Sequence, residues 1–252
     1  MVETGMRKVR RAKRSAAKPV RGEQLALGLP KPTGKHGGKR EGAGRPRSSR
    51  SGEAPHRARP MHRKRHPVHV VLRAVKDVPR LRTDRMFKAI RAALRTIGGR
   101  IGFRVVHASI QRTHLHFLVE AEDKQVLTRG VRALAIAMAR RINAACGRRG
   151  KVFARYHATV ITSRRQARNT LAYVLNNWRH HREDEDSLRA RFAALDPYAT
   201  GYAFDGWKEP IEPPEDFVPL PAVSPETWLL RAGWRNHPPI SVREVPKDSI
   251  RP

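Results

Sequence analysis

Apolar positions recur at regular spacing only in the middle of the chain, between residues 67 and 208. Runs rich in β-branched residues predict strands over 68–72, 103–110, 114–120 and 153–161. Apolar positions three and four residues apart predict three helices. The helices are expected to run from Thr83 to Ile97, from Asp123 to Cys146, and onward from a cap at Thr162 or Ser163.

The elements follow the order β-α-β-β-α-β-α. Residues 111–113 form a short polar turn between the second and third strands, so these two strands should pair as an antiparallel hairpin. The order predicts an α+β fold, namely a ferredoxin-like split βαβ sandwich with an antiparallel sheet and an additional C-terminal helix.

The two flanking segments lack this periodicity. Residues 1–66 hold 20 Lys/Arg against four Glu, which predicts a basic DNA-binding arm that is disordered on its own. Residues 209–252 hold 10 of the 19 prolines, which predicts an irregular tail pinned by anchors such as Trp228, Leu229, Leu230 and Trp234. The predicted organisation is therefore an arm (1–66), a folded domain (67–208) and a tail (209–252).

Charge limits the partners of this chain. With 53 Lys/Arg and 22 Asp/Glu, the net charge of +31 favours nucleic acid, an anionic membrane surface or an acidic protein. The single cysteine, Cys146, excludes an intramolecular disulfide framework and a four-cysteine zinc site. No apolar run reaches the roughly 18 residues of a membrane span, and no secretory h-region follows the basic N-terminus. We therefore expect a cytoplasmic, nucleoid-associated protein without a membrane partner.

The first candidate for chemistry is the sequence His114-Leu115-His116 at the start of the predicted third strand. Side chains alternate between the faces of a strand, so both imidazoles should project from one face. Two adjacent imidazoles form half of a metal site. The motif is short, and a histidine pair that merely hydrogen-bonds on a sheet surface is the alternative.

The second candidate lies on the last predicted helix, where Asn169, Tyr173 and Asn177 share one face. A helix packed across the sheet would bring Tyr173 near the hairpin, and Asn177 could supply a third, oxygen ligand to an ion. Such an ion could polarise a phosphate while Tyr173 attacks the phosphorus. The alternatives are that Tyr173 is an ordinary half-buried aromatic, or that Tyr156 is the nucleophile.

Together these residues resemble the REP-associated tyrosine transposases, which are single-tyrosine HUH nucleases related to insertion-sequence transposases. The resemblance covers about residues 67–182. It rests on the segments H-L-H-F-L-V-E, G-R-R-G-K-V-F-A-R-Y-H-A and L-A-Y-V-L-N-N, in this order.

The resemblance implies a specific activity. His114 and His116 would bind Mg²⁺ or Mn²⁺, Asn177 would complete the metal site, and Tyr173 would be the nucleophile. The enzyme would cut single-stranded DNA beside a hairpin, leave a 5′-phosphotyrosine and a free 3′-OH, and be able to rejoin strands. Monomer and homodimer both stay open, because related transposases use both.

Several arginines are candidate DNA contacts. Gly44-Arg45-Pro46-Arg47 partly matches the core of an AT-hook, so Arg45 and Arg47 would contact either a minor groove or phosphates. Arg112 lies in the hairpin turn, and Arg164, Arg165 and Arg168 begin the last helix. The acidic run 183–186 is expected to be a solvated turn.

Two other functions remain as alternatives. A non-catalytic nucleic-acid-binding module on a ferredoxin-like sheet would need exposed aromatics on its middle strands, where this chain has histidines. A zinc hydrolase would need a third His or carboxylate ligand at a defined spacing.

Overall fold

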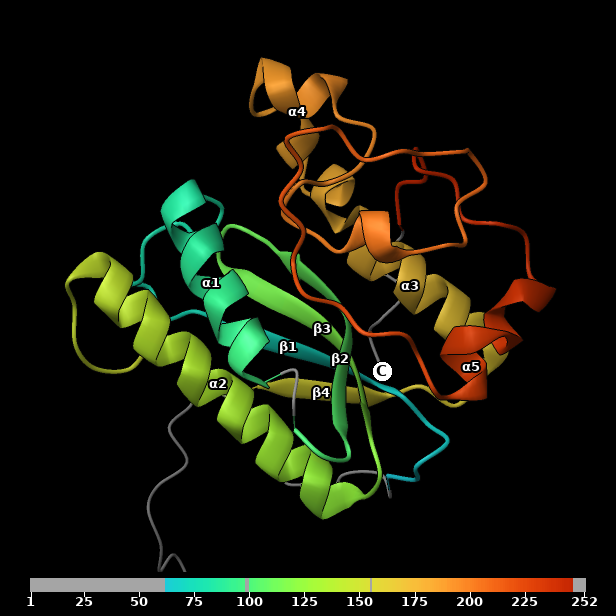
Figure 1. Cartoon of the computed structure of the whole chain (residues 1–252), viewed down its shortest axis with the longest axis horizontal. Coiled ribbons are helices and arrows are strands. Elements are labelled where there is room, and N and C mark those ends of the chain that lie inside the picture. The colour runs from blue at the N-terminus through green and yellow to red at the C-terminus, as the bar shows by residue number, and fades with distance from the viewer. Residues whose placement is uncertain (1–61, 98–99, 155, 247–252) are drawn as a thin grey trace, which may run out of the picture. The chain divides into compact units, whose positions relative to one another are not determined.

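A four-stranded antiparallel sheet lies at the centre of the structure (Figure 1). The computed structural model describes residues 62–97, 100–154 and 156–246. The chain forms two units, residues 1–56 and 57–252, and only the second contains described residues. Residues 1–61 of the predicted arm, with Arg45 and Arg47, therefore lie outside the described residues, whereas His62 at its end is buried against the folded unit.

The sheet has the strand order β2-β3-β1-β4, and every neighbouring pair is antiparallel. With helices between the strands, this order confirms the predicted ferredoxin-like fold with one additional helix. The elements in chain order are β1 (Val68–Arg73), α1 (Asp84–Ile97), β2 (Phe103–Ile110), β3 (His114–Ala121), α2 (Lys124–Cys146), β4 (His157–Val160) and α3 (Arg164–His180).

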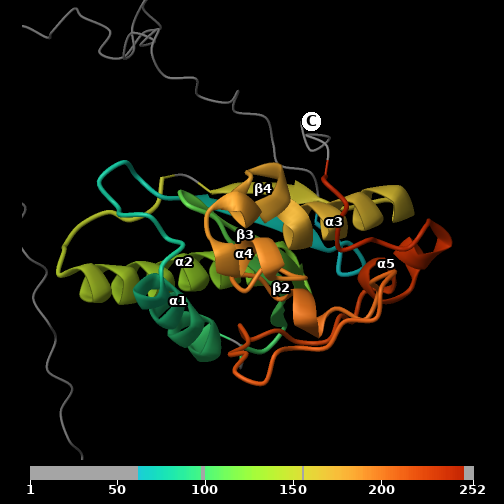
Figure 2. The same cartoon turned by 90° about the horizontal axis from the view of Figure 1, so that it is seen from above.

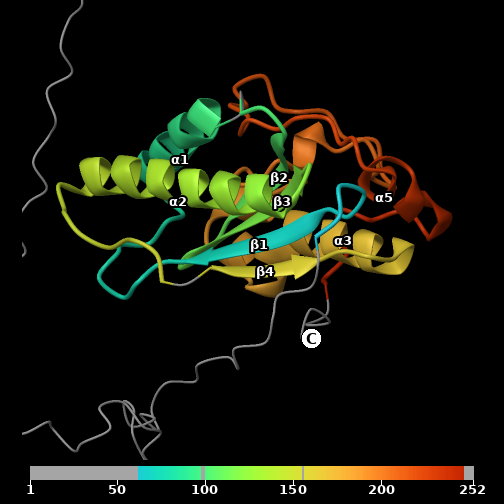
Figure 3. The same cartoon turned by 90° about the horizontal axis from the view of Figure 1, so that it is seen from below.

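The two faces of the sheet carry separate apolar clusters. Helices α1 and α2 cover one face, and α3 lies on the opposite face (Figure 3). Alternation along β3 distributes its side chains accordingly: Leu115 and Phe117 join the cluster under α1 and α2, whereas Leu118 packs with Leu171 and Leu175 of α3. Each helix is thus fixed by the burial of one apolar face.

Local capping explains where the helices begin and end. The carboxylate of Asp123 accepts hydrogen bonds from the backbone N–H groups of Gln125 and Val126, and α2 stops at Gly147, which has a φ of 63°. Ser163 caps α3 by accepting from the N–H of Gln166. These residues were the ones that the sequence predicted as helix boundaries.

The fourth strand is shorter than predicted. Regular pairing with β1 covers only β4, whereas Phe153 meets Ala74 in an isolated bridge. The Phe153 side chain is instead buried in the core under α1 and α2. The predicted strand over 153–161 is therefore two short stretches of pairing rather than one.

Beyond α3 the chain is mostly irregular. It contains the short elements η1 (Glu183–Glu185), α4 (Leu188–Phe192), η2 (Gly201–Ala203), α5 (Trp228–Arg231) and η3 (Gly233–Asn236). Helix α5 lies beside α3 (Figure 2). Leu229, Leu230 and Trp234 are buried as anchors, while Trp228 is 49% exposed and packs under the Arg164 guanidinium.

The end of β3 holds this C-terminal segment on the sheet. The buried Glu120 carboxylate accepts hydrogen bonds from the Thr227 hydroxyl and from the backbone N–H groups of Glu226 and Thr227. Three donors satisfy a carboxylate that would otherwise be costly to bury.

The acidic run after α3 is not the solvated turn that the sequence predicted. Glu183 is only 2% exposed and forms an ion pair with Arg82, which also pairs with Asp196 at 2.9 Å. Burial raises the pKa of the Glu183 carboxyl, although the charge of Arg82 opposes that shift. This cluster ties the segment after α3 to the loop before α1.

No helix among the residues placed by the structure is long and apolar enough to cross a membrane.

Buried histidines make the stability of this fold depend on pH. Burial lowers the pKa of His107, whose Nδ1 lies 3.1 Å from the Thr200 hydroxyl, to about 4. In the unfolded chain, His107 binds a proton near pH 6.5, whereas in the folded chain it stays neutral down to about pH 4. The free energy of unfolding should therefore fall as the pH drops below 6.5. In urea titrations at pH 7, 6 and 5, His107→Gln should reduce this loss by about 1 kcal/mol per pH unit.

A matched control is His157→Gln, because the His157 side chain is exposed. If His107→Gln and the wild type lose stability equally between pH 6 and 5, the burial of a neutral His107 is contradicted.

Candidate active site

Strand β3 places two histidines side by side at its beginning. His114 and His116 project to the α3 face, with ring centroids 4.7 Å apart and planes at 83°. The intervening Leu115 is completely buried on the other face. The structure thus confirms the predicted alternation along this strand.

Helix α3 brings the predicted tyrosine and amide to the same place. Asn177 is completely buried, and its Nδ2 lies 2.8 Å from Nε2 of His116. The Tyr173 ring stands edge-on to the His116 ring, with centroids 5.3 Å apart. Four of the predicted residues, from β3 and α3, therefore meet at one point of a single chain.

A third histidine, His69 of β1, completes this cluster and was not among the predicted site residues. Its Nε2 lies 3.0 Å from Nδ1 of His116, and the two rings stack with centroids 5.1 Å apart. Its ring also contacts Tyr173 edge-on, at 6.0 Å. His62, seven residues earlier in the chain, bonds instead to the carbonyl of Ala121.

The imidazoles in this cluster are neutral at pH 7. Burial lowers the pKa of His69 to about 3 and that of His116 well below its usual value. Burial also lowers the pKa of His114 to about 4, with smaller effects from the nearby charges of His181 and Arg73. Neutral imidazoles keep the lone pair that a metal ligand needs.

The hydrogen bonds assign one tautomer to His116. With the Asn177 amide turned so that Nδ2 faces His116, Nε2 of His116 accepts and carries no proton. The single proton of the neutral ring is then on Nδ1, which donates to Nε2 of His69. The lone pair of His116 Nε2 therefore points toward Asn177.

The position of Asn177 beside His116 agrees with its predicted role as the third, oxygen ligand of a divalent ion. The Oδ1 atom of Asn177 is buried without a hydrogen-bond partner, and a half-turn of the amide would place it beside His116 Nε2. Within the described part of the chain, no three His, Cys, Asp or Glu side chains are grouped to hold a metal ion. The set of two imidazole nitrogens and one amide oxygen is a different set, and it would leave open positions on a divalent ion such as Mn²⁺.

The predicted DNA-binding arginines fall into two groups. Arg112 forms ion pairs with Glu183 and Asp186, and Arg168 pairs with Glu244. Arg164 and Arg165 are exposed at the start of α3.

The competing tyrosine, Tyr156, is partly buried against the core under α1 and α2. The cluster with Tyr173 lies on the other face of the sheet.

Two histidines at the end of α3 border the cluster. The His181 ring lies 5.5 Å from that of His114, and the His180 ring lies 6.4 Å from that of Tyr173. They extend the row of aromatic rings toward the surface.

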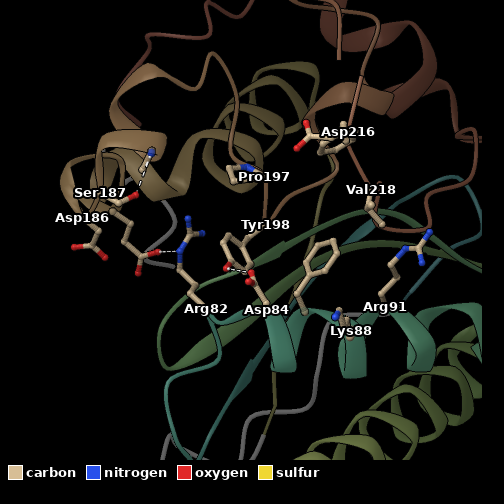
Figure 4. A pocket seen from close by; sticks show the side chains of 14 residues that line it. Arg82, Asp84, Lys88, Arg91, Asp186, Ser187, Pro197, Tyr198, Asp216 and Val218 are labelled. Carbon is tan, nitrogen blue, oxygen red and sulfur yellow. Dashed lines mark hydrogen bonds and ion pairs between the residues drawn. The ribbon is translucent and has the colours of Figure 1, made fainter. Parts of the chain in front are cut away.

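A cavity of about 680 Å³ lies elsewhere, between α1, the segment around α4 and residues 216–218 (Figure 4). Acidic and basic side chains alternate around it, and Tyr198 donates a hydrogen bond to Asp84 within it. The cavity contains none of the predicted catalytic or metal-binding residues.

The structure is thus a ferredoxin-like domain with paired histidines on a central strand and a tyrosine on an added helix. Residues 62–177 match a family model described as "Transposase IS200 like". Over these 116 of its 252 residues, slightly less than half of the chain, the protein is similar to the IS200-like transposases.

Solved structures are similar at a lower level. A REP-associated tyrosine transposase bound to a REP hairpin is 14% identical, with a TM-score of 0.41 over 50% of this chain and 73% of that chain. A protein from Deinococcus radiodurans R1, described as a transposase, is 20% identical, with a TM-score of 0.34 over 42% of this chain and 85% of its own. The comparison with curated proteins found no match. Similarity at this level does not carry a function over from either structure.

The metal ligands predicted from the sequence lead to a simple binding test. Mutating a residue that only orients a metal ligand typically lowers metal affinity by about 10–100-fold. His116→Ala removes a ligand itself, so it should weaken Mn²⁺ binding by more than about 100-fold. Calorimetry with Mn²⁺ alone measures this, and hairpin DNA binding should stay largely intact because phosphate contacts dominate it. His157→Ala is the control, and an unchanged Mn²⁺ affinity in His116→Ala would refute the site.

Proposed function

We propose that this chain is a metal-dependent single-strand DNA endonuclease and strand transferase that acts at hairpin DNA. The observation that carries the proposal is the convergence of His114, His116, Asn177 and Tyr173. Similarity to the IS200-like transposases over residues 62–177 makes DNA the substrate to expect.

His114, His116 and Asn177 would hold Mg²⁺ or Mn²⁺, and an ion bound there would polarise the scissile phosphate and stabilise charge on its oxygens. Tyr173 attacks the phosphorus through its phenolic oxygen, and the bond from phosphorus to the 3′-oxygen breaks. The phenol loses one proton and the leaving 3′-oxygen gains one. The products are a 5′-phosphotyrosine and a free 3′-OH, which can reverse the reaction on the same strand or a new one.

The position of Tyr173 supports it over Tyr156. Tyr173 contacts the rings of His116 and His69, whereas Tyr156 packs into the opposite core. The residues meet within one chain, which favours cutting by the tyrosine of the same chain over an exchange of tyrosines between two chains.

Basic side chains beside His114 suit a DNA backbone. Arg73 pairs in register with His114, and the loop carrying Arg148, Arg149 and Lys151 joins the same end of β1 through the Ala74–Phe153 bridge. Sequence reasoning did not single out these loop residues. They would accompany Arg164 and Arg165 in a DNA path that runs past the histidines.

The hairpin is part of the proposal because the catalytic segments of the sequence resemble those of the REP-associated tyrosine transposases, which implies cutting beside a hairpin. A location with the nucleoid in the cytoplasm would follow from this substrate.

Replacing the tyrosine tests the proposal directly. Tyr173→Phe removes one oxygen and keeps the ring, so the variant should fold, bind Mn²⁺ and bind DNA, yet form no covalent adduct. The measurement is a denaturing gel of protein incubated with labelled single-stranded hairpin DNA and Mn²⁺. The wild-type adduct band should disappear in Tyr173→Phe and persist in the control Tyr156→Phe.

The reverse pattern would assign the chemistry to Tyr156. If the wild type forms no adduct on any hairpin, a non-catalytic DNA-binding module becomes the better account.

We also propose that residues 1–66 form a DNA-binding arm. Deleting residues 1–60 should lower DNA affinity and flatten the dependence of log K on log[salt] by about 0.7 for each phosphate that the arm no longer neutralises. Cutting of saturating substrate should survive, because the proposed catalytic residues lie downstream. An unchanged salt slope, measured by fluorescence anisotropy, would show that the arm does not bind phosphates.

A further inference from the structure

We propose that His69 is a positioning residue that fixes the tautomer and the ring orientation of His116 for metal binding. The inference rests on the proposed function, since it assigns a role within the same site. It concerns a residue outside the predicted catalytic and metal-binding set.

The first step is the geometry between the strands. In the sheet, Val71 of β1 pairs with His116 of β3, and His69 lies two residues back on the same face as Val71. This diagonal position lets two aromatic side chains meet across the strands. The ring planes lie 17° apart, and His69 Nε2 lies 3.0 Å from His116 Nδ1. The contact therefore combines ring stacking with a hydrogen bond, which fixes its direction.

The second step is that both imidazole rings are buried away from water. His69 is 2% exposed and His116 is 3% exposed, so water does not replace the hydrogen bond between them. Nδ1 of His69 has no hydrogen-bond partner within the described structure, so the ring interacts through Nε2. An unmatched polar atom is costly to bury, and its presence favours a role other than simple packing.

The third step is the consequence for the ligand atom. A proton on His116 Nδ1, held by the acceptor His69 Nε2, leaves His116 Nε2 with its lone pair directed at Asn177. Without that acceptor, the proton could move to Nε2 and block the ligand position. Ligating histidines commonly donate their second N–H to such a partner, which sets the tautomer and strengthens the ligand.

Two substitutions separate this role from packing. In His69→Gln, the side-chain oxygen can take the place of Nε2 and accept from His116. His69→Leu fills similar space and accepts nothing. Hairpin binding and circular dichroism of the full-length variants check that both remain folded.

The first measurement is made on metal-free protein. Long-range ¹H–¹⁵N spectra, with His116 assigned by comparison with His116→Ala, report which ring nitrogen carries the proton. His116 should be protonated at Nδ1 in the wild type and in His69→Gln, and should shift toward Nε2 in His69→Leu. Protonation at Nε2 in the wild type would overturn the inference by itself.

The second measurement is calorimetry with Mn²⁺ alone. His69→Leu should weaken Mn²⁺ binding by about 10–100-fold, whereas His69→Gln should stay within a few-fold of the wild type. Equal losses in both variants would assign His69 a direct or purely steric role, and no loss in either would remove the role. If the wild type binds no Mn²⁺, the proposed function fails, while the tautomer measurement still decides the inference.

Discussion

The packing of α3 across β2 and β3 is the interaction on which the rest of the site depends. Val106 and Leu118 of the sheet are buried against Leu171, Val174 and Leu175 of the helix. Burying side chains of this size stabilises the packing by roughly 1.5–3 kcal/mol each, enough to fix the helix at one place on the sheet. With the helix fixed, Tyr173 and Asn177, one turn apart on its polar side, must face His116. The chemistry proposed here is thus a consequence of which helix face is apolar.

The segment after α3 reinforces that placement. Arg168 pairs with Glu244, Asn176 donates to the Ser241 carbonyl, and Arg179 donates to the Val242 carbonyl. At the far end, the buried Arg82–Glu183 pair links the residues after the helix to the loop before α1. Breaking a buried pair by removing one partner is costly, so this end of α3 is held firmly. The irregular tail therefore acts as a support for the helix that carries the tyrosine.

Local chemistry made much of this structure predictable. Helix ends could be predicted at Asp123, Gly147 and Ser163 because capping depends on neighbours a few residues away. The short spacing between His114 and His116, and between Tyr173 and Asn177, likewise shows that each pair shares a face. Long-range partners could not be predicted in this way. His69 lies 47 residues from His116, and its alternating strand pattern carried no signal for that contact. The ion pairs of Arg112 with Asp186 and of Arg168 with Glu244 join residues 74 and 76 positions apart, so local spacing could not predict them.

The central claim is that the residue joined to DNA lies on α3, facing the histidines of β3. Trypsin would release Tyr173 in the peptide 169–179 and Tyr156 in the peptide 156–164. Mass spectrometry of the adduct formed with hairpin DNA and Mn²⁺, after nuclease and trypsin digestion, identifies the attached peptide. The account predicts a nucleotide linked through a 5′-phosphate to peptide 169–179. A nucleotide on peptide 156–164 would contradict it.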